Sequence, residues 1–230
     1  MSEIKTSLPS IIQFISTPGA QRGRVPAQLR AMYEDPTRHP WRYYDPIVTA
    51  VVKGLRTGEL PAERQKIERL RTELDLAVVR SQEREESDRR CRGQSVHYAE
   101  IAAGMLKVRR RVGPLRVFGA PSGVWRHRDL RVGVTPHLLV ERRGGVQEVW
   151  FLHLKATRLS QSTADGALVI MGEAMRSVGC DAVPRIVDVR SGSVGFALNR
   201  TRDLPMLTAY ARSEAEAFAS LWEARAKAAA

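Results

Sequence analysis

Two histidines and one lysine stand near the ends of two consecutive strand-like segments. His137 lies near the start of the first segment, residues 134–141, and His153 and Lys155 lie at the end of the second, residues 146–154. The Arg-Arg-Gly-Gly run between them is typical of a tight hairpin turn. Because side chains alternate along a strand, His153 and Lys155 share a face, and hairpin pairing brings His137 across from about residues 151–153. The pattern predicts a cluster whose imidazoles suit transition-metal ions and whose ammonium stabilises negative charge.

The segments around this hairpin must supply the rest of a fold. Apolar residues at helical spacing alternate with short β-branched runs, which predicts a mixed α/β fold with a small sheet flanked by helices. The expected elements are helices at residues 94–112, 165–178 (capped by Ser162 or Thr163) and 206–227, and strands at 115–118, 125–132, 184–189 and 194–198.

Residues 1–90 are expected to form a helical N-terminal region or separate module, and residues 94–230 the α/β core with its C-terminal helix. A long charged helix is predicted at 61–90, where it could hold a protein partner or a second copy of the chain. Trp41, Tyr43 and Tyr44 lie before it. These rings fit a base-stacking platform or, the interpretation we favour, a small core between helices.

The chain is strongly basic, with 37 Lys and Arg against 25 Asp and Glu and a net charge of +12. Such an excess, mostly arginine, favours a polyanionic partner, and we expect DNA rather than RNA. An Arg-rich source genome would give the same excess. The basic residues expected to contact phosphates lie in two places. Those at the end of the 94–112 helix are Lys107, Arg109, Arg110 and Arg111, and those in the 125–132 segment are Arg126 and Arg128. Favourable helix termination alone would also explain the group at the helix end.

The remaining composition indicates a cytoplasmic protein. Cys91 and Cys180 are far apart and lack metal-ligand spacing, so we expect free thiols in a reducing compartment. The N-terminus has no signal-peptide pattern, and no apolar run is long enough to span a membrane.

The order helix, hairpin, x-x-Lys, helix, strand resembles the PD-(D/E)xK nuclease superfamily, which includes restriction endonucleases and RecB-type nucleases. The resemblance covers about residues 94–200. In that superfamily the first hairpin strand begins with Pro-Asp and the second ends with Asp/Glu-x-Lys. The corresponding residues here are Pro136-His137 and His153-Leu154-Lys155, and Glu100 corresponds to a glutamate that often helps to hold the metal ion.

The resemblance implies an altered site, because histidines occupy both acidic positions. Mg²⁺ and Mn²⁺ prefer carboxylate oxygens, whereas imidazoles suit softer ions such as Zn²⁺ or Ni²⁺. The resemblance therefore implies a nucleic-acid-binding protein with a degenerate, inactive nuclease fold. Such a protein would act as a subunit in nucleic-acid processing or in defence against phages and mobile elements. No cofactor is expected, and a divalent metal ion only if activity remains.

Other interpretations stay open from the sequence. His137 and His153 fit relics of a lost site, a real transition-metal site that includes Glu100, or ordinary half-buried strand histidines. At the level of function, the alternatives are an active metal-dependent nuclease using His137, His153 and Lys155, and a scaffold protein that acts through its N-terminal helices.

Overall fold

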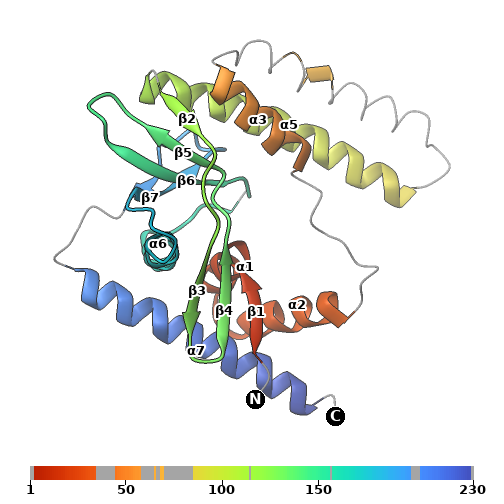
Figure 1. Ribbon diagram of the computed structural model, residues 1–230. Helices are drawn as coiled ribbons and strands as arrows, with labels where there is room; N and C mark the ends of the chain where they lie inside the picture. Colours follow the sequence, from red (N-terminus) through yellow and green to blue (C-terminus); the bar gives the residue numbers. More distant parts are fainter. Residues whose placement is uncertain are drawn as a thin grey trace.

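The computed structural model describes residues 3–34, 45–57, 65, 68–69, 85–113, 115–155, 157–197 and 203–228 (Figure 1). Two sheets and six α-helices form an α/β architecture within these residues, which confirms the expected fold class. In chain order the elements are β1 (Ile4–Ser7), α1 (Leu8–Ser16), the 3-10 helix η1 (Gly19–Gly23), α2 (Arg24–Glu34), α3 (Asp45–Thr57), α5 (Glu85–Val112), β2 (Arg116–Phe118), β3 (Gly123–His127), β4 (Leu130–Val134), β5 (Leu138–Glu141), β6 (Gln147–His153), α6 (Gln161–Arg176), β7 (Val183–Asp188), β8 (Phe196–Ala197) and α7 (Leu204–Ala228).

The larger sheet has the strand order β2-β5-β6-β7-β8. Strands β5 and β6 form the expected hairpin, closed by a hydrogen bond from Arg142 N to Val146 O at 2.9 Å. Helix α6 then carries the chain over to β7, which pairs with β6 in parallel. Parallel neighbours require such a crossover, and burial on both faces explains why β6 reads as a nearly continuous apolar run.

Helices α3 and α5 cover one face of this sheet, which we call the α5 side (Figure 1). Residues of α5 at helical spacing pack on the even positions of β6, because strand side chains alternate. Close approach at one point depends on glycine: a Cβ on Gly104 would lie 1.7 Å from the carbonyl oxygen of Val189. The buried cluster includes Ile47, Val51, Tyr98, Ile101, Met105, Trp150, Leu152 and Val187.

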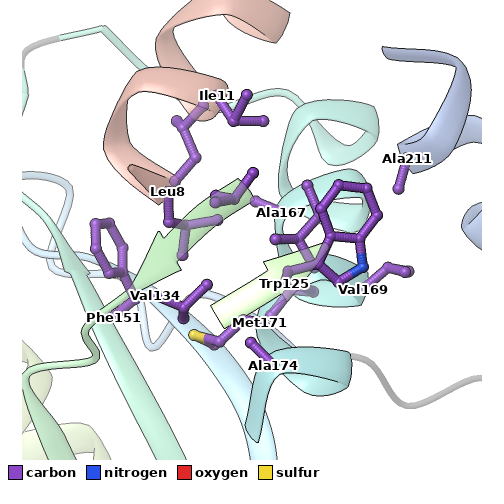
Figure 2. Packing of buried hydrophobic residues seen from close by; sticks show 14 of the residues in the cluster. Leu8, Ile11, Trp125, Val134, Phe151, Ala167, Val169, Met171, Ala174 and Ala211 are labelled. Atoms are coloured by element: carbon purple, nitrogen blue, oxygen red, sulfur yellow. The ribbon is translucent and has the colours of Figure 1, made fainter. Parts of the chain in front are cut away.

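The opposite face, the α6 side, packs against α6, α1 and the smaller sheet, with α7 closing the same core (Figure 2). Phe151 of β6, Val134 of β4 and Leu8 of α1 all lie in this cluster, and Figure 2 shows them close together. The N-terminal strand and helix therefore share a core with the last helix of the chain.

The smaller sheet has the order β1-β4-β3, with β1 parallel to β4 and a hairpin between β3 and β4. After β4 the chain passes through Thr135, Pro136 and His137 into β5, so a connection of three residues joins the two sheets. Proline at this passage suits a residue that leaves one ladder and has no amide hydrogen to donate to the next.

The elements differ from the sequence expectations in several places, and the segment 125–132, expected as one strand, folds into the β3–β4 hairpin. Strand β1 lies in a region expected to be helical, and α5 runs without a break through Gly93, where we had placed a boundary. Helix α6 begins earlier than expected, because Ser160 rather than Ser162 or Thr163 is its N-cap and accepts a hydrogen bond from Thr163 N.

Several expectations fall on residues that the structure does not describe. These include the aromatic group Trp41, Tyr43 and Tyr44 and most of the predicted 61–90 helix, whose last six residues begin α5. Cys180 carries a free thiol, while the side chain of Cys91 lies outside the described set. Within the part of the chain that is described, no helix is both long and apolar enough to cross a bilayer.

Candidate functional site

The residues singled out from the sequence lie at the end of the β5–β6 hairpin, on the α6 side of the larger sheet. The ring of His137 packs against Phe151 in a tilted geometry, with 5.0 Å between ring centroids and 57° between the ring planes, and Phe151 belongs to the α6-side core. His153 follows two positions later on the same strand and therefore shares that face. Lys155 reaches α1, where its Nζ donates a hydrogen bond to Gln13 Oε1 at 2.8 Å. All three side chains thus lie toward the same layer of the molecule.

His137 acts as an internal acceptor that fixes the hairpin. Its backbone N–H donates to Trp150 O at 2.9 Å, and its Nδ1 accepts from Leu152 N at 3.0 Å. An imidazole nitrogen that accepts carries no proton, so the ring is neutral with hydrogen on Nε2. Burial lowers the pKa of His137 to about 4, in agreement with this bonding. The side chain stabilises the hairpin in the position where a metal-binding carboxylate was expected by resemblance.

His153 is only 5% exposed and is also held by the backbone. Its Nε2 donates to Thr157 O at 2.8 Å, which sets the tautomer and leaves Nδ1 without a proton. Burial is the main cause that lowers the pKa of His153, the charges of Lys155 and Arg190 lower it further, and Thr157 O and Asp188 act in the opposite direction. The ring is therefore a neutral strand-end residue at ordinary pH.

Asp188 is a neighbour of His153 that sequence reasoning missed. It ends β7, lies in register with His153 on the adjacent parallel strand, and is 7% exposed. Its Oδ1 accepts a long hydrogen bond of 3.4 Å from Ser191 N. A carboxylate that ends the apolar run Ile186-Val187 was the available signal, because buried acidic residues are uncommon without a local reason. A histidine, a carboxylate and Lys155 thus gather where β6 and β7 end.

Glu100 lies apart from this group. It projects from α5, on the other side of the sheet, and pairs with Arg190 Nη1 at 3.3 Å and with His97 Nδ1 at 3.7 Å. Among the described residues, no three His, Cys, Asp or Glu side chains are placed to hold a metal ion together. The donor set of a hard Mg²⁺ site is therefore not met by Glu100, His137 and His153, two of which bond to the backbone.

Burial also lowers the pKa of the Lys155 ammonium. Its hydrogen bond to Gln13 ties the end of the β6 strand to α1, so the amide compensates part of the cost of partial burial. Arg190 has a similar position on the neighbouring strand end, with its side chain 11% exposed. The cationic groups beside His153 thus each contact a residue from another element.

The six basic residues expected to contact phosphates fall in two separate places. Four lie on the last turns of α5, whereas Arg126 lies in β3 and Arg128 in the β3–β4 turn, and this hairpin is on the other side of the molecule (Figure 1). Several are already engaged: Arg109 donates to Gly113 O, Arg111 to Gly192 O at 2.9 Å, and Arg128 pairs with Glu216 at 3.1 Å. Those that remain exposed, with no hydrogen bond or ion pair inside the described chain, are Lys107, Arg110 and Arg126.

No protein-family model, curated protein or solved structure matches this chain.

Proposed function

We propose that this protein binds nucleic acid through a nuclease-like α/β core that does not hydrolyse the bound strand. The observation that carries the proposal is the order of elements around the hairpin. Helix α5, the antiparallel strands β2, β5 and β6, the crossover helix α6 and the parallel strand β7 follow one another, with the β3–β4 hairpin inserted. This order is similar to that of the PD-(D/E)xK core, and Lys155 follows the hairpin at the position that the resemblance implies.

The chemistry of the hairpin supports a role without hydrolysis. Metal-assisted phosphodiester cleavage needs an ion that activates water and neutralises charge on the phosphate. Carboxylates would hold that ion, yet His137 and His153 are neutral and bonded to the backbone through Leu152 N and Thr157 O. Asp188 supplies one carboxylate beside them, and one such ligand holds Mg²⁺ weakly.

Charge supports binding. The chain carries a net charge of +12, and Lys107 and Arg110 project from the last turns of α5. Neutralising phosphates with such groups releases condensed counterions, which supplies sequence-independent affinity. A place in nucleic-acid processing or in defence against phages and mobile elements follows from the resemblance alone.

The test compares two variants with equal loss of charge in a DNA-binding assay with chelator present. Lys107→Gln/Arg110→Gln removes the α5 pair, and Arg24→Gln/Arg212→Gln removes two exposed charges on α2 and α7. We expect the first to weaken binding of a short duplex several-fold and the second to change it little. Equal effects would exclude α5 as a contact surface, and absence of binding by the wild type would refute the proposal.

Cleavage separates this proposal from the active-nuclease alternative. Incubation of the wild type with plasmid and oligonucleotides in Mg²⁺, Mn²⁺, Zn²⁺ or Ni²⁺ should leave the nucleic acid intact. Cleavage that is lost in Lys155→Ala would instead identify an enzyme that works at this hairpin.

A further inference from the structure

Three basic side chains form one row across the smaller sheet. The register pairs Lys5 of β1 with Arg131 of β4, and Arg131 with Arg126 of β3. Directly paired residues on neighbouring strands point to the same face, with Cβ atoms about 5 Å apart. We call Lys5, Arg131 and Arg126 the basic row. The sequence singles out Arg126 but not the row, because Lys5 lies more than a hundred residues before its partner Arg131.

The basic row faces solvent. The residues that alternate with it, Ile4, Val132 and Trp125, point into the α6-side core and are at most 3% exposed. The side chain of Lys5 is 71% exposed and that of Arg131 is 32% exposed. Helices thus cover only the inner face of the sheet, and the described chain places no element over the outer one (Figure 1).

Like charges in direct register repel one another and destabilise a sheet. One carboxylate offsets this: both oxygens of Glu3 lie 3.1 Å from Arg131 Nη1, and one lies 3.9 Å from Lys5 Nζ. Three positive charges against one negative charge leave a net charge of two within about 10 Å of sheet surface. The face therefore carries an excess of positive charge, which attracts an anionic partner.

A second row beside the first contains two small residues, Ser7 and Gly133, and one exposed apolar residue, Val124, which is 37% exposed. Gly133 of β4 is paired with Ser7 of β1 and with Val124 of β3. Gly133 leaves this part of the face shallow, so a flat partner can approach the backbone. A cationic surface of this kind suits a phosphate backbone, because guanidinium forks match phosphate oxygens.

We infer that the outer face of the smaller sheet is a contact surface for a nucleic-acid backbone, with the basic row pairing with its phosphates. The inference rests on the proposed function and adds a second contact surface, separate from the last turns of α5. Strand β1 and the β3–β4 hairpin would then both contact the bound nucleic acid.

The test measures how DNA affinity depends on salt for two matched triple variants. Lys5→Gln/Arg126→Gln/Arg131→Gln removes the basic row, and Arg24→Gln/Arg176→Gln/Arg212→Gln removes three exposed charges on α2, α6 and α7. For duplex DNA each lost phosphate contact lowers the slope of log affinity against log salt by about 0.9. We expect a drop of roughly 2 to 3 and at least about tenfold weaker binding at low salt for the first variant only.

A single substitution gives the opposite effect and covers the case in which the triple variant fails to fold. Glu3→Gln frees Arg131 and Lys5 from their carboxylate, so DNA binding should tighten several-fold. An unchanged or weaker affinity of Glu3→Gln would overturn the inference, as would a basic-row variant that behaves like its control. Displacement of DNA by polyglutamate of equal charge would show an unspecific acidic-polymer surface and would overturn it too. Absence of DNA binding by the wild type would instead remove the proposed function itself.

Discussion

At the scale of single residues, the two histidines of the hairpin serve the backbone. Nδ1 of His137 accepts a hydrogen bond from Leu152 N, and Nε2 of His153 donates one to Thr157 O. In each histidine, one ring nitrogen is therefore bonded to a backbone atom of the same chain. A buried N–H that loses its acceptor costs free energy close to its full desolvation penalty. The histidines therefore stabilise the hairpin through hydrogen bonds to the backbone.

Replacing His137 tests this role. His137→Ala removes the acceptor of Leu152 N, and we expect the free energy of unfolding to fall by about 2 kcal/mol. His137→Asn keeps a side-chain oxygen that can accept from the same N–H and should recover about half of that loss. Urea unfolding followed by circular dichroism measures both values. Equal stability of the alanine variant and the wild type would show that the hydrogen bond contributes nothing.

The low pKa of His137 predicts a dependence of stability on pH. Its pKa is about 4 in the folded protein and about 6.5 in an unfolded chain, so the unfolded state binds more protons between these values. The neutral His137 ring contributes its full amount to the free energy of unfolding above pH 6.5. This contribution, about 3 kcal/mol in total, is lost as the pH falls toward 4. His153, whose pKa is also lowered, adds to the loss in the same direction.

NMR spectra recorded between pH 4 and 6.5 follow the imidazole resonances, and the resonance that is missing in His137→Asn belongs to His137. The His137→Asn variant should also lose less stability than the wild type as the pH falls. Titration of the His137 ring near 6.5 would contradict the buried, neutral state.

At this scale the sequence predicts which strand face the residues share, but it does not predict their hydrogen-bond partners. Strand alternation predicts that His153 and Lys155 share a face, and their contacts agree. The partners Leu152 N and Thr157 O are backbone atoms whose orientation depends on the local path of the chain, which residue types do not specify. Asp188 was missed because register with His153 is a property of the folded parallel pair.

At the scale of elements, α5 lies very close to the backbone of the residue that follows β7. Gly104 allows the helix to lie against the carbonyl of Val189, where a Cβ would have no room. The adjoining turn is held by Arg111, which donates to Gly192 O at 2.9 Å. The position of α5 over the sheet thus depends on one missing side chain.

Two glycine-to-alanine substitutions in helices separate this steric effect from helix propensity. In the interior of a helix, alanine is more favourable than glycine by about 1 kcal/mol. Gly172→Ala on α6 meets only Pro184 Cγ at 3.4 Å, so it should be neutral or stabilising. Gly104→Ala should instead destabilise the protein by roughly 1 to 3 kcal/mol, because α5 must shift away from β7. Thermal unfolding of the two variants compares them, and a stabilising Gly104→Ala would contradict the packing.

Long periodic elements were predictable and short or distant pairings were not. Helices α5, α6 and α7 and strands β6 and β7 carry clear apolar patterns. Strand β1 has four residues, and its partner β4 lies more than a hundred residues away, so local sequence held no sign of the pairing. The start of α6 was misplaced because three hydroxyl residues, Ser160, Ser162 and Thr163, can each act as a cap.

At the scale of the whole molecule, the N-terminal region is part of the same packed structure as the rest. Strand β1 completes the smaller sheet, α1 and α2 contribute Leu8, Val25 and Leu29 to the α6-side core, and α3 packs with α5 on the other side. The expected division near residue 90 therefore does not separate the cores. A scaffold function through α1 to α3 would have to use their outer surfaces.

Charge is the property of the whole molecule on which the proposed function depends, and the salt dependence of DNA affinity tests it most directly. The measurement is fluorescence anisotropy of a labelled short duplex with the wild-type protein, with chelator present, over a series of salt concentrations. The account predicts binding at low salt that weakens linearly in a plot of log affinity against log salt, with intact DNA at the end. No binding at the lowest salt, or an affinity independent of salt, would contradict it.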